Sequence, residues 1–343
     1  MRDASSSALG DAVLAALHDD DFPLVVRPLD PLLADDPRAV ANWFAAQQSV
    51  IERVLADYGA IMFRDFAIRS TADFAAVVEG YPSLPDGYVG GATPREVVAG
   101  RVFEATRLAA SAPIVLHQEM AYLPRWPRKL AFYCHRAPDS GGETVLSSVR
   151  RFERGIEPRL RDAIAERGLL LMRNFRGGAE VPPGLEGVHR SWQEAFYTQH
   201  PAKAEADLAA MGLEHRWEDD GSLTTCFGAG GFVEHPVTGE RHWFNSLIAH
   251  TLLPQTMGPT WQIYAETYRD GRPRPYEARF GDGGPIPLDD VVALCLVLDA
   301  KTITLPYRDG DVLMIDNILT FHGRNPYTGH RDVQVALLEQ GSH

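Results

Sequence analysis

Residues 111–148 read SAPIVLHQEMAYLPRWPRKLAFYCHRAPDSGGETVLSS and contain three runs that are typical of β-strands. PIVLHQEM and KLAFYCHRA are rich in apolar residues, and the turn PDSGGE joins the second run to the strand-like TVLSS. Side chains two positions apart on a strand point to the same face, so His117 and Glu119 can converge on one ion. One imidazole and one carboxylate leave a metal ion under-coordinated, so this pair needs a third ligand.

Strand-like runs continue to the C-terminus, and helical segments lie between two groups of them. The last three strand-like runs are KTITLPY, DVLMIDNILTFHG and RDVQVALLE, and LLLMRNFR precedes them in the middle of the chain. Apolar spacing predicts helices over residues 36–58, 71–80, 148–168, 202–212 and 287–300. This order favours a mainly β (α+β) protein with a closed β architecture and flanking helices over alternating βαβ units.

The third metal ligand is best supplied by His322, which lies in the strand-like run MIDNILTFHG. Two histidines and one carboxylate form the facial triad of non-haem Fe(II) oxygenases, which leaves coordination positions open. A structural zinc site would be closed by four ligands, commonly including thiolates. A His-x-Glu pattern alone is more often a solvated strand surface. His235 and His242 flank the turn PVTGE, and we interpret them as loop or hydrogen-bonding residues.

The composition is that of a globular protein and excludes several function classes. The 343 residues are 45% hydrophobic and 23% charged, with a formal net charge of -13 that disfavours general nucleic-acid binding. Neither a signal peptide nor an apolar run long enough for a membrane span is evident. The three cysteines are far apart and are expected to be reduced thiols, mostly buried, in a cytoplasmic protein.

Three blocks resemble the TauD/TfdA superfamily of Fe(II)- and 2-oxoglutarate-dependent dioxygenases, in its clavaminate-synthase-like and SyrP-like branch. They are residues 111–148, HPVTGERHWFNS (235–246), and FGDGGPIPLDD (280–290) running on to RDGDVLMIDNILTFHGRNPYTGHRDVQVAL (308–337). The resemblance implies a double-stranded β-helix, a jelly-roll or cupin-like barrel with flanking helices. It implies one catalytic domain over residues 1–343, with helical decoration over about 1–58 and the jelly-roll core over about 59–340.

The same resemblance implies the residues that hold the cofactors. His117, Glu119 and His322 would bind Fe(II), and Glu119 argues against a halogenase, in which a small residue replaces the carboxylate. Arg331 matches the arginine that pairs with the far carboxylate of 2-oxoglutarate, and Thr144 matches the threonine that helps to hold it. Arg324 is a rival for the arginine role. The chain departs from the family pattern at Asp332, where a second basic residue often follows, and the carboxylate clamp is therefore less firmly assigned than the iron ligands.

The resemblance also points to substrate residues and a substrate class. Residues that could line the substrate pocket, or could equally be core or framework, are Met120, Tyr122, Trp126, Arg173, Gln193, Phe244 and Asn245. Arg173 could meet a substrate carboxylate. The implied substrate is an amino acid or amino-acid derivative, either free or tethered to a carrier protein in natural-product assembly.

The implied reaction is hydroxylation of an unactivated C–H bond with 2-oxoglutarate and O₂. Desaturation, epoxidation or cyclisation could follow from the same ligands, and the sequence leaves the outcome and the oligomeric state open. Two other readings remain: a non-haem iron enzyme on the same barrel that does not use 2-oxoglutarate, and a binding protein that kept the fold without catalysis.

Overall fold

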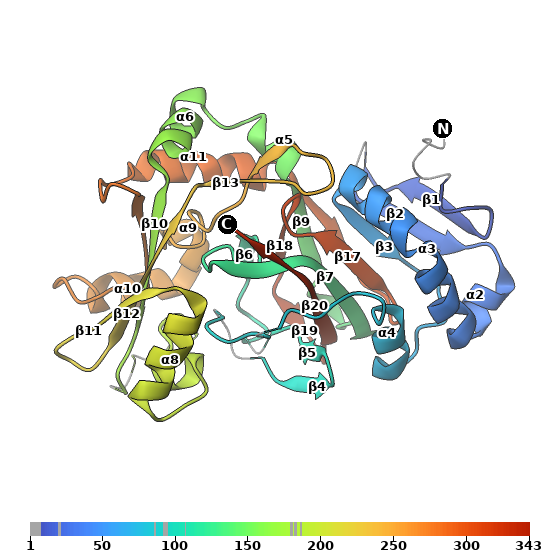
Figure 1. Ribbon diagram of the computed structural model, residues 1–343, viewed down its shortest axis with the longest axis horizontal. Coiled ribbons are helices and arrows are strands. Elements are labelled where there is room, and N and C mark those ends of the chain that lie inside the picture. Colours follow the sequence, from blue (N-terminus) through green and yellow to red (C-terminus); the bar gives the residue numbers. More distant parts are fainter. Residues whose placement is uncertain are drawn as a thin grey trace.

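The computed structural model describes residues 8–19, 22–85, 87–91, 95–106, 108–178, 181, 184–185 and 187–343, and this part of the chain is mainly β (Figure 1). Its largest sheet has eight strands. In spatial order they are β1 (Val13–Leu17), β2 (Leu24–Pro28), β3 (Ala60–Phe63), β17 (Val312–Asp316), β7 (Arg125–Arg136), β20 (Asp332–Ser342), β5 (Val102–Glu104) and β4 (Val97–Ala99). Neighbouring strands run antiparallel except β2 and β3, which are parallel.

A second sheet of four antiparallel strands carries two of the three predicted metal ligands. Its spatial order is β16 (Thr302–Leu305), β9 (Thr144–Ser148), β18 (Thr320–Arg324) and β6 (Ile114–His117). In the register of this sheet His322 on β18 stands directly opposite His117 on β6. Strand pairing therefore brings together two histidines that are far apart in sequence.

A third sheet and two short ribbons complete the β structure. The third sheet has the order β11 (Glu214–Trp217), β12 (Leu223–Ala229), β10 (Leu169–Phe175) and β15 (Tyr276–Phe280). The ribbons pair β13 (Phe232–Glu234) with β14 (Arg241–Trp243), and β19 (Tyr327–Thr328) with β8 (Ser140–Gly141). In Figure 1 the third sheet lies on the left, on the opposite side of the molecule from β1 and β2.

The helices flank these sheets. They are α2 (Pro31–Asp35), α3 (Pro37–Tyr58), α4 (Thr71–Val77), α5 (Val149–Glu153), α6 (Pro158–Arg167), α7 (Trp192–Ala195), α8 (Pro201–Met211), α9 (Pro254–Met257), the 3-10 turn η1 (Gly258–Thr260), α10 (Trp261–Thr267) and α11 (Leu288–Asp299). The longest, α3, begins after Asp36, whose side chain accepts a hydrogen bond from the Arg38 amide, and ends at Gly59 in the left-handed conformation.

The large sheet is buried on both faces. Leu130 and Phe132 of β7 belong to a hydrophobic cluster shared with the second sheet. Ala131 and Tyr133, which alternate with them along the strand, belong to a cluster shared with α3 and α4. The ring of Phe132 also lies 5.4 Å from the ring of His322. Alternate residues of one strand thus face a helical layer on one side and the sheet with the histidines on the other.

The predicted mainly β class is confirmed, but one predicted strand is divided. The run DVLMIDNILTFHG is not a single strand: β17 ends at Asp316, and β18 begins at Thr320 in the other sheet. Asp316 Oδ1 accepts hydrogen bonds from the amides of Ile318 and Leu319, which closes a turn between the two strands. This turn carries the chain from the large sheet into the sheet that contains His322.

Two helical predictions also differ from the structure. The segment 148–168 contains two helices, α5 and α6, because the chain turns near Gly155 and Pro158 begins the second helix. A Cβ at Gly155 would lie 2.5 Å from Val297 Cγ1, so this close approach requires glycine. The N-terminal region predicted as helical decoration over about 1–58 includes β1 and β2 in addition to helices, and these short strands join the large sheet.

Candidate metal centre and its surroundings

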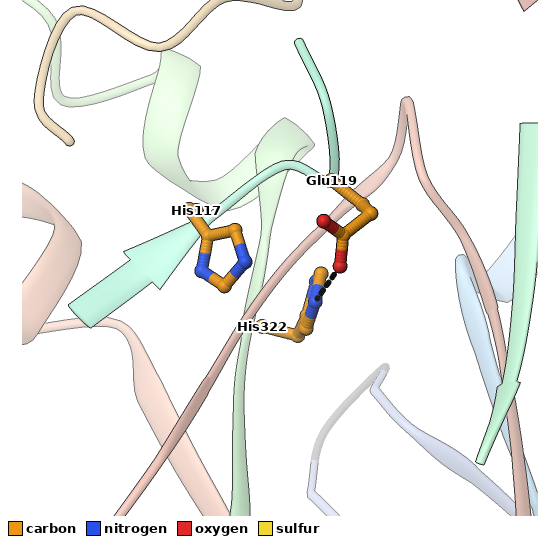
Figure 2. A group of neighbouring side chains, drawn as sticks. All are labelled: His117, Glu119 and His322. Atoms are coloured by element: carbon orange, nitrogen blue, oxygen red, sulfur yellow. Dashed lines mark ion pairs between the residues drawn. The ribbon is translucent and has the colours of Figure 1, made fainter. Parts of the chain in front are cut away.

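Three side chains converge between the strands: His117, Glu119 and His322 (Figure 2). One ligand atom from each lies within 4.8 Å of the others, and Glu119 Oε2 lies 3.6 Å from His322 Nε2. The rings of His117 and His322 are 4.4 Å apart. All three predicted metal ligands are therefore brought together, with Glu119 only 1% and His322 only 5% exposed.

Glu119 reaches the group from a turn rather than from a strand. The strand β6 ends at His117, so the expected strand alternation does not itself orient Glu119. Asn317, in the turn between β17 and β18, holds it by accepting a hydrogen bond from the Glu119 amide (2.8 Å) and donating one to the Glu119 carbonyl (2.9 Å). The Gln118 side chain points elsewhere, toward the carbonyls of Trp243 and Ile318.

The His117 imidazole is suited to bind a cation in its neutral form. His117 Nδ1 lies 2.9 Å from the Val115 carbonyl, to which it can donate, and this leaves Nε2 as the acceptor. Burial, followed by the proximity of His322, lowers the pKa of His117 to about 4. At neutral pH this ring therefore offers a lone pair rather than a positive charge.

The Glu119 carboxylate is ionised and has two further partners. Although burial raises its pKa, the charge of Arg95 and the neighbouring histidines lower it well below its usual value. Arg95 Nη2 donates to Oε2 (2.7 Å), and the Tyr88 hydroxyl donates to Oε1 (2.9 Å). The Arg95 guanidinium also lies 4.2 Å from the centre of the Tyr88 ring. The oxygen that faces His322 is thus the one that Arg95 contacts.

Two imidazole nitrogens and one carboxylate oxygen form a donor set that fits Fe(II) with open coordination positions. Within the part of the chain that the structure describes, His117, Glu119 and His322 are the group of three His, Cys, Asp or Glu side chains close enough together to hold a metal ion. His235 is hydrogen-bonded to Asp316 (2.9 Å), and His242 to Glu153 (3.0 Å). The prediction that these two histidines serve as hydrogen-bonding residues is confirmed.

The sequence matches a family model over nearly the whole chain. Residues 26–337 match the family described as "Taurine catabolism dioxygenase TauD, TfdA family". The chain belongs to the TauD/TfdA family. The predicted family and the predicted enzyme class, a dioxygenase, are confirmed by this match.

Relatives of known name and known structure agree with this family. A clavaminate synthase-like protein of Arabidopsis thaliana is 34% identical over 92% of this chain and 93% of the relative. The dapdiamide synthesis protein DdaC of Enterobacter agglomerans is 30% identical over 84% of each chain. PvcB, described as an Fe, alpha-ketoglutarate dependent oxygenase, has a TM-score of 0.51 at 14% identity, covering 96% of this chain and 92% of PvcB. That likeness shows the shared fold.

The residues predicted to hold 2-oxoglutarate lie close together, with an additional tyrosine that the sequence did not suggest. Thr144 on β9 is hydrogen-bonded to the Tyr307 hydroxyl (2.9 Å), and both side chains are buried. Arg331 donates from Nε to the Gly142 carbonyl (2.9 Å) and forms no ion pair with a carboxylate of any described residue. Burial lowers the pKa of Arg331, although the proximity of Tyr307 opposes the shift.

Arg324, the rival for the arginine role, has other hydrogen-bond partners. Its Nη atoms donate to the carbonyls of Leu108, Ala109 and Ala112. Burial and the nearby Arg331 lower its pKa to about 10. Its contacts fasten the segment 108–112 to β18.

The structure brings three of the predicted substrate residues to the region beside Glu119. Met120, in the left-handed conformation (φ 56°), lines a small pocket together with Val89, Leu123 and Met211. Tyr122 is buried, and its hydroxyl has no hydrogen-bond partner among the described residues. Arg173 on β10 places its guanidinium 4.7 Å from the centre of the Tyr122 ring.

The other four predicted substrate residues have framework contacts. The Trp126 and Phe244 rings pack 4.1 Å apart. Asn245 bonds to the Gly231 carbonyl and the Leu247 amide, and Gln193 Nε2 donates to the Gly177 carbonyl. Strand β20 extends to Ser342, and the His343 ring that follows it lies 5.4 Å from the Phe244 ring.

Several residues beside the site carried no recognisable sequence pattern: Tyr88, Arg95, Arg190, His250, Tyr307 and Asn317. They come from different loops and turns, and each acts through a contact made only on folding. The expectation of unpaired, mostly buried cysteines is confirmed, since Cys134, Cys226 and Cys295 are free and two of them are buried. No helix among the described residues is long and apolar enough to cross a membrane.

Proposed function

We propose that this protein is an Fe(II)- and 2-oxoglutarate-dependent oxygenase that hydroxylates an unactivated C–H bond of an amino acid or an amino-acid-derived natural-product intermediate. The observation that carries the proposal is the convergence of His117, Glu119 and His322 in a member of the TauD/TfdA family. Iron bound there would supply activation of O₂ coupled to the oxidative decarboxylation of 2-oxoglutarate to succinate and CO₂.

The protein residues would hold and orient the reactants. His117, Glu119 and His322 would bind Fe(II), with Asn317 keeping the Glu119 main chain in place. Arg331 and Thr144 would hold the far carboxylate of 2-oxoglutarate. Support for this role is that Arg331 is partly buried without an ionic partner among the described residues, because such a cation is stabilised by a carboxylate. Arg324 would instead anchor the segment 108–112.

The substrate would lie beside Glu119, near Met120, Tyr122 and Arg173. The names of two relatives favour natural-product chemistry: DdaC is a dapdiamide synthesis protein, and PvcB belongs to an isonitrile synthetic pathway. Trp126, Phe244, Asn245 and Gln193 would shape the walls through the framework contacts described above. A free amino acid and a carrier-tethered one both remain within this proposal.

We further infer that the large sheet and the sheet with the histidines form a double-stranded β-helix, and that the chain is a single catalytic domain. The hydrophobic cluster that the two sheets share supports both inferences. The compartment that we propose is the cytoplasm, which three free cysteines support.

The test is an anaerobic titration followed by turnover. Fe(II) and 2-oxoglutarate added together should produce a visible charge-transfer band that neither produces alone, and O₂ should then yield succinate. His322→Ala should abolish both, with an unchanged far-UV circular dichroism spectrum. His215→Ala, on the exposed strand β11, is the control and should retain the band. A band that persists in His322→Ala would refute the ligand assignment.

A further inference from the structure

Two arginines, Arg173 and Arg190, lie buried side by side near the metal ligands. Each is 5% exposed. Arg173 Nη2 and Arg190 Nη1 both point to the carbonyl oxygen of Gly91, at 3.4 and 2.9 Å. Neither guanidinium forms an ion pair with a carboxylate of the described residues. Arg173 also donates to the Gly90 carbonyl, and Arg190 to the Glu194 carbonyl. Neutral carbonyls do not carry the negative charge that would balance two buried cations, and an uncompensated buried charge is costly.

Polar atoms without partners surround this pair. Among the described residues, no hydrogen bond reaches Arg173 Nε, Arg190 Nε, the Tyr122 hydroxyl or either ring nitrogen of His250. Buried donors of this kind are rare in folded proteins and call for an explanation. The atoms belong to one contiguous group, because the His250 ring lies 5.4 Å from Tyr122 and Arg173 lies 4.7 Å from the same tyrosine ring.

The group adjoins the metal centre on the side of Glu119. Tyr122 follows Glu119 by three residues, and the Gly91 amide donates to the Tyr88 carbonyl (3.0 Å) while the Tyr88 hydroxyl donates to Glu119. Tyr276 on β15 closes the far side, with its ring 5.1 Å from His250 and 5.5 Å from Arg173. The loop that contains Tyr88 and Gly91 thus connects the two arginines to the metal ligand Glu119.

We propose that Arg173 and Arg190, together with Tyr122 and His250, form a subsite that binds the carboxylate of the substrate. This inference rests on the proposed function and narrows its substrate to a carboxylate-bearing compound. The carboxylate accepts hydrogen bonds from the unpartnered Nε–H groups, while the Nη groups keep the carbonyls of Gly90 and Gly91. The Tyr122 hydroxyl and one N–H of neutral His250 supply further donors.

The subsite is tested with two probes of equal size, N-acetylglycine and its neutral counterpart N-acetylglycinamide. Their binding to the enzyme loaded with Mn(II) and saturating 2-oxoglutarate is measured by calorimetry. We expect N-acetylglycine to bind and the amide to bind at least 10-fold more weakly. Arg190→Met should raise the Kd of the acid at least 10-fold, and Arg173→Lys should weaken it as well, because lysine lacks the planar fork.

Arg216→Met is the matched control, because this arginine has a side chain that is 74% exposed and should not affect either probe. Circular dichroism establishes that each variant is folded, and Arg190→Met suffices if Arg173→Lys does not fold. Equal binding of acid and amide, no binding of the acid, or full binding in Arg190→Met would overturn the subsite. Loss of the charge-transfer band with iron would instead count against the proposed function, so the two failures are distinguishable.

Discussion

Arg331 and Arg324 show how the hydrogen-bond partners of a side chain separate two candidates of the same residue type. Arg324 donates to three main-chain carbonyls, whereas Arg331 donates to one and has no ionic partner among the described residues. The two guanidiniums are close enough for Arg331 to lower the pKa of Arg324. Because Arg331 has fewer internal hydrogen bonds, it is the arginine that we propose for the carboxylate of 2-oxoglutarate.

Arg331→Ala is therefore expected to raise the 2-oxoglutarate concentration needed for half-maximal band formation by on the order of 10- to 100-fold, since a charge-assisted bidentate pair is worth about 1.5–3 kcal/mol. The measurement is an anaerobic titration at saturating Fe(II). Arg324→Ala should lower thermal stability with a smaller change in this requirement. The reverse order of the two effects would transfer the carboxylate role to Arg324.

Arg95 provides a second prediction at this scale. Its Nη2 bonds to Glu119 Oε2, the oxygen that also faces His322, so a divalent cation at this position would lie close to a guanidinium of like charge. We expect Arg95→Met to tighten Mn(II) binding on the order of 10-fold, measured by paramagnetic resonance titration of the metal-stripped protein. Arg216→Met should leave the affinity unchanged. Weaker binding in Arg95→Met would mean that Arg95 supports the ligand carboxylate instead.

Among the secondary-structure elements, the junction of α3 with the turn between β17 and β18 positions His322. Gly59 ends α3 with φ 74°, and its carbonyl accepts hydrogen bonds from the Asp316 amide (2.8 Å) and from Thr320 Oγ1 (2.7 Å). A Cβ at Gly59 would lie 2.9 Å from Thr320 Oγ1. One glycine thus ends a helix and fastens the turn that leads into β18.

Gly59→Ala should therefore destabilise the protein by about 2–4 kcal/mol, because the left-handed backbone costs alanine about 1–2 kcal/mol and the contact with Thr320 adds to it. Gly212→Ala is the control. Gly212 ends α8 at φ 75° with no atom near its Cβ, and only the cost of about 1–2 kcal/mol is expected there. Urea unfolding measures both, and equal losses would show that the Thr320 contact is unimportant.

For the molecule as a whole, buried neutral histidines make stability depend on pH. Burial, followed by the nearby Arg176, lowers the pKa of His189 to about 4, and burial with Arg173 lowers that of His250 to about 3. In the unfolded chain both would titrate near about 6.5. The unfolded state therefore binds more protons below this pH, and stability falls as the pH drops from about 6.5 toward 4.

Urea unfolding at pH 7.5 and pH 5.0 should show this loss, with net proton uptake on unfolding. His189→Asn should reduce the difference between the two pH values, although it also removes the hydrogen bond to Tyr268. His215→Asn, on the exposed strand β11, should leave the difference unchanged. Equal stability at both pH values would contradict this account.

Local patterns in the chain were enough to predict much of the architecture, and together with the family resemblance they pointed to the three ligand residues. Helix α3 was predicted from apolar spacing, and β10 from a short apolar run, because such elements depend on residues close in sequence. The pairing of His117 with Glu119, and the choice of His322, followed from residue type and from the family resemblance.

Contacts between distant segments could not be predicted in this way. The division of 312–324 between two sheets, the hydrogen bonds of Asn317 to Glu119, and the meeting of Arg173 with Arg190 and His250 all arise from packing. To bind a metal, the Glu119 carboxylate must point toward the two histidines. Its direction is set by hydrogen-bond partners from other strands and loops, which the position of Glu119 in the sequence does not reveal. Residue type and spacing thus established which groups can bind a metal, whereas the folded arrangement established where each of them points.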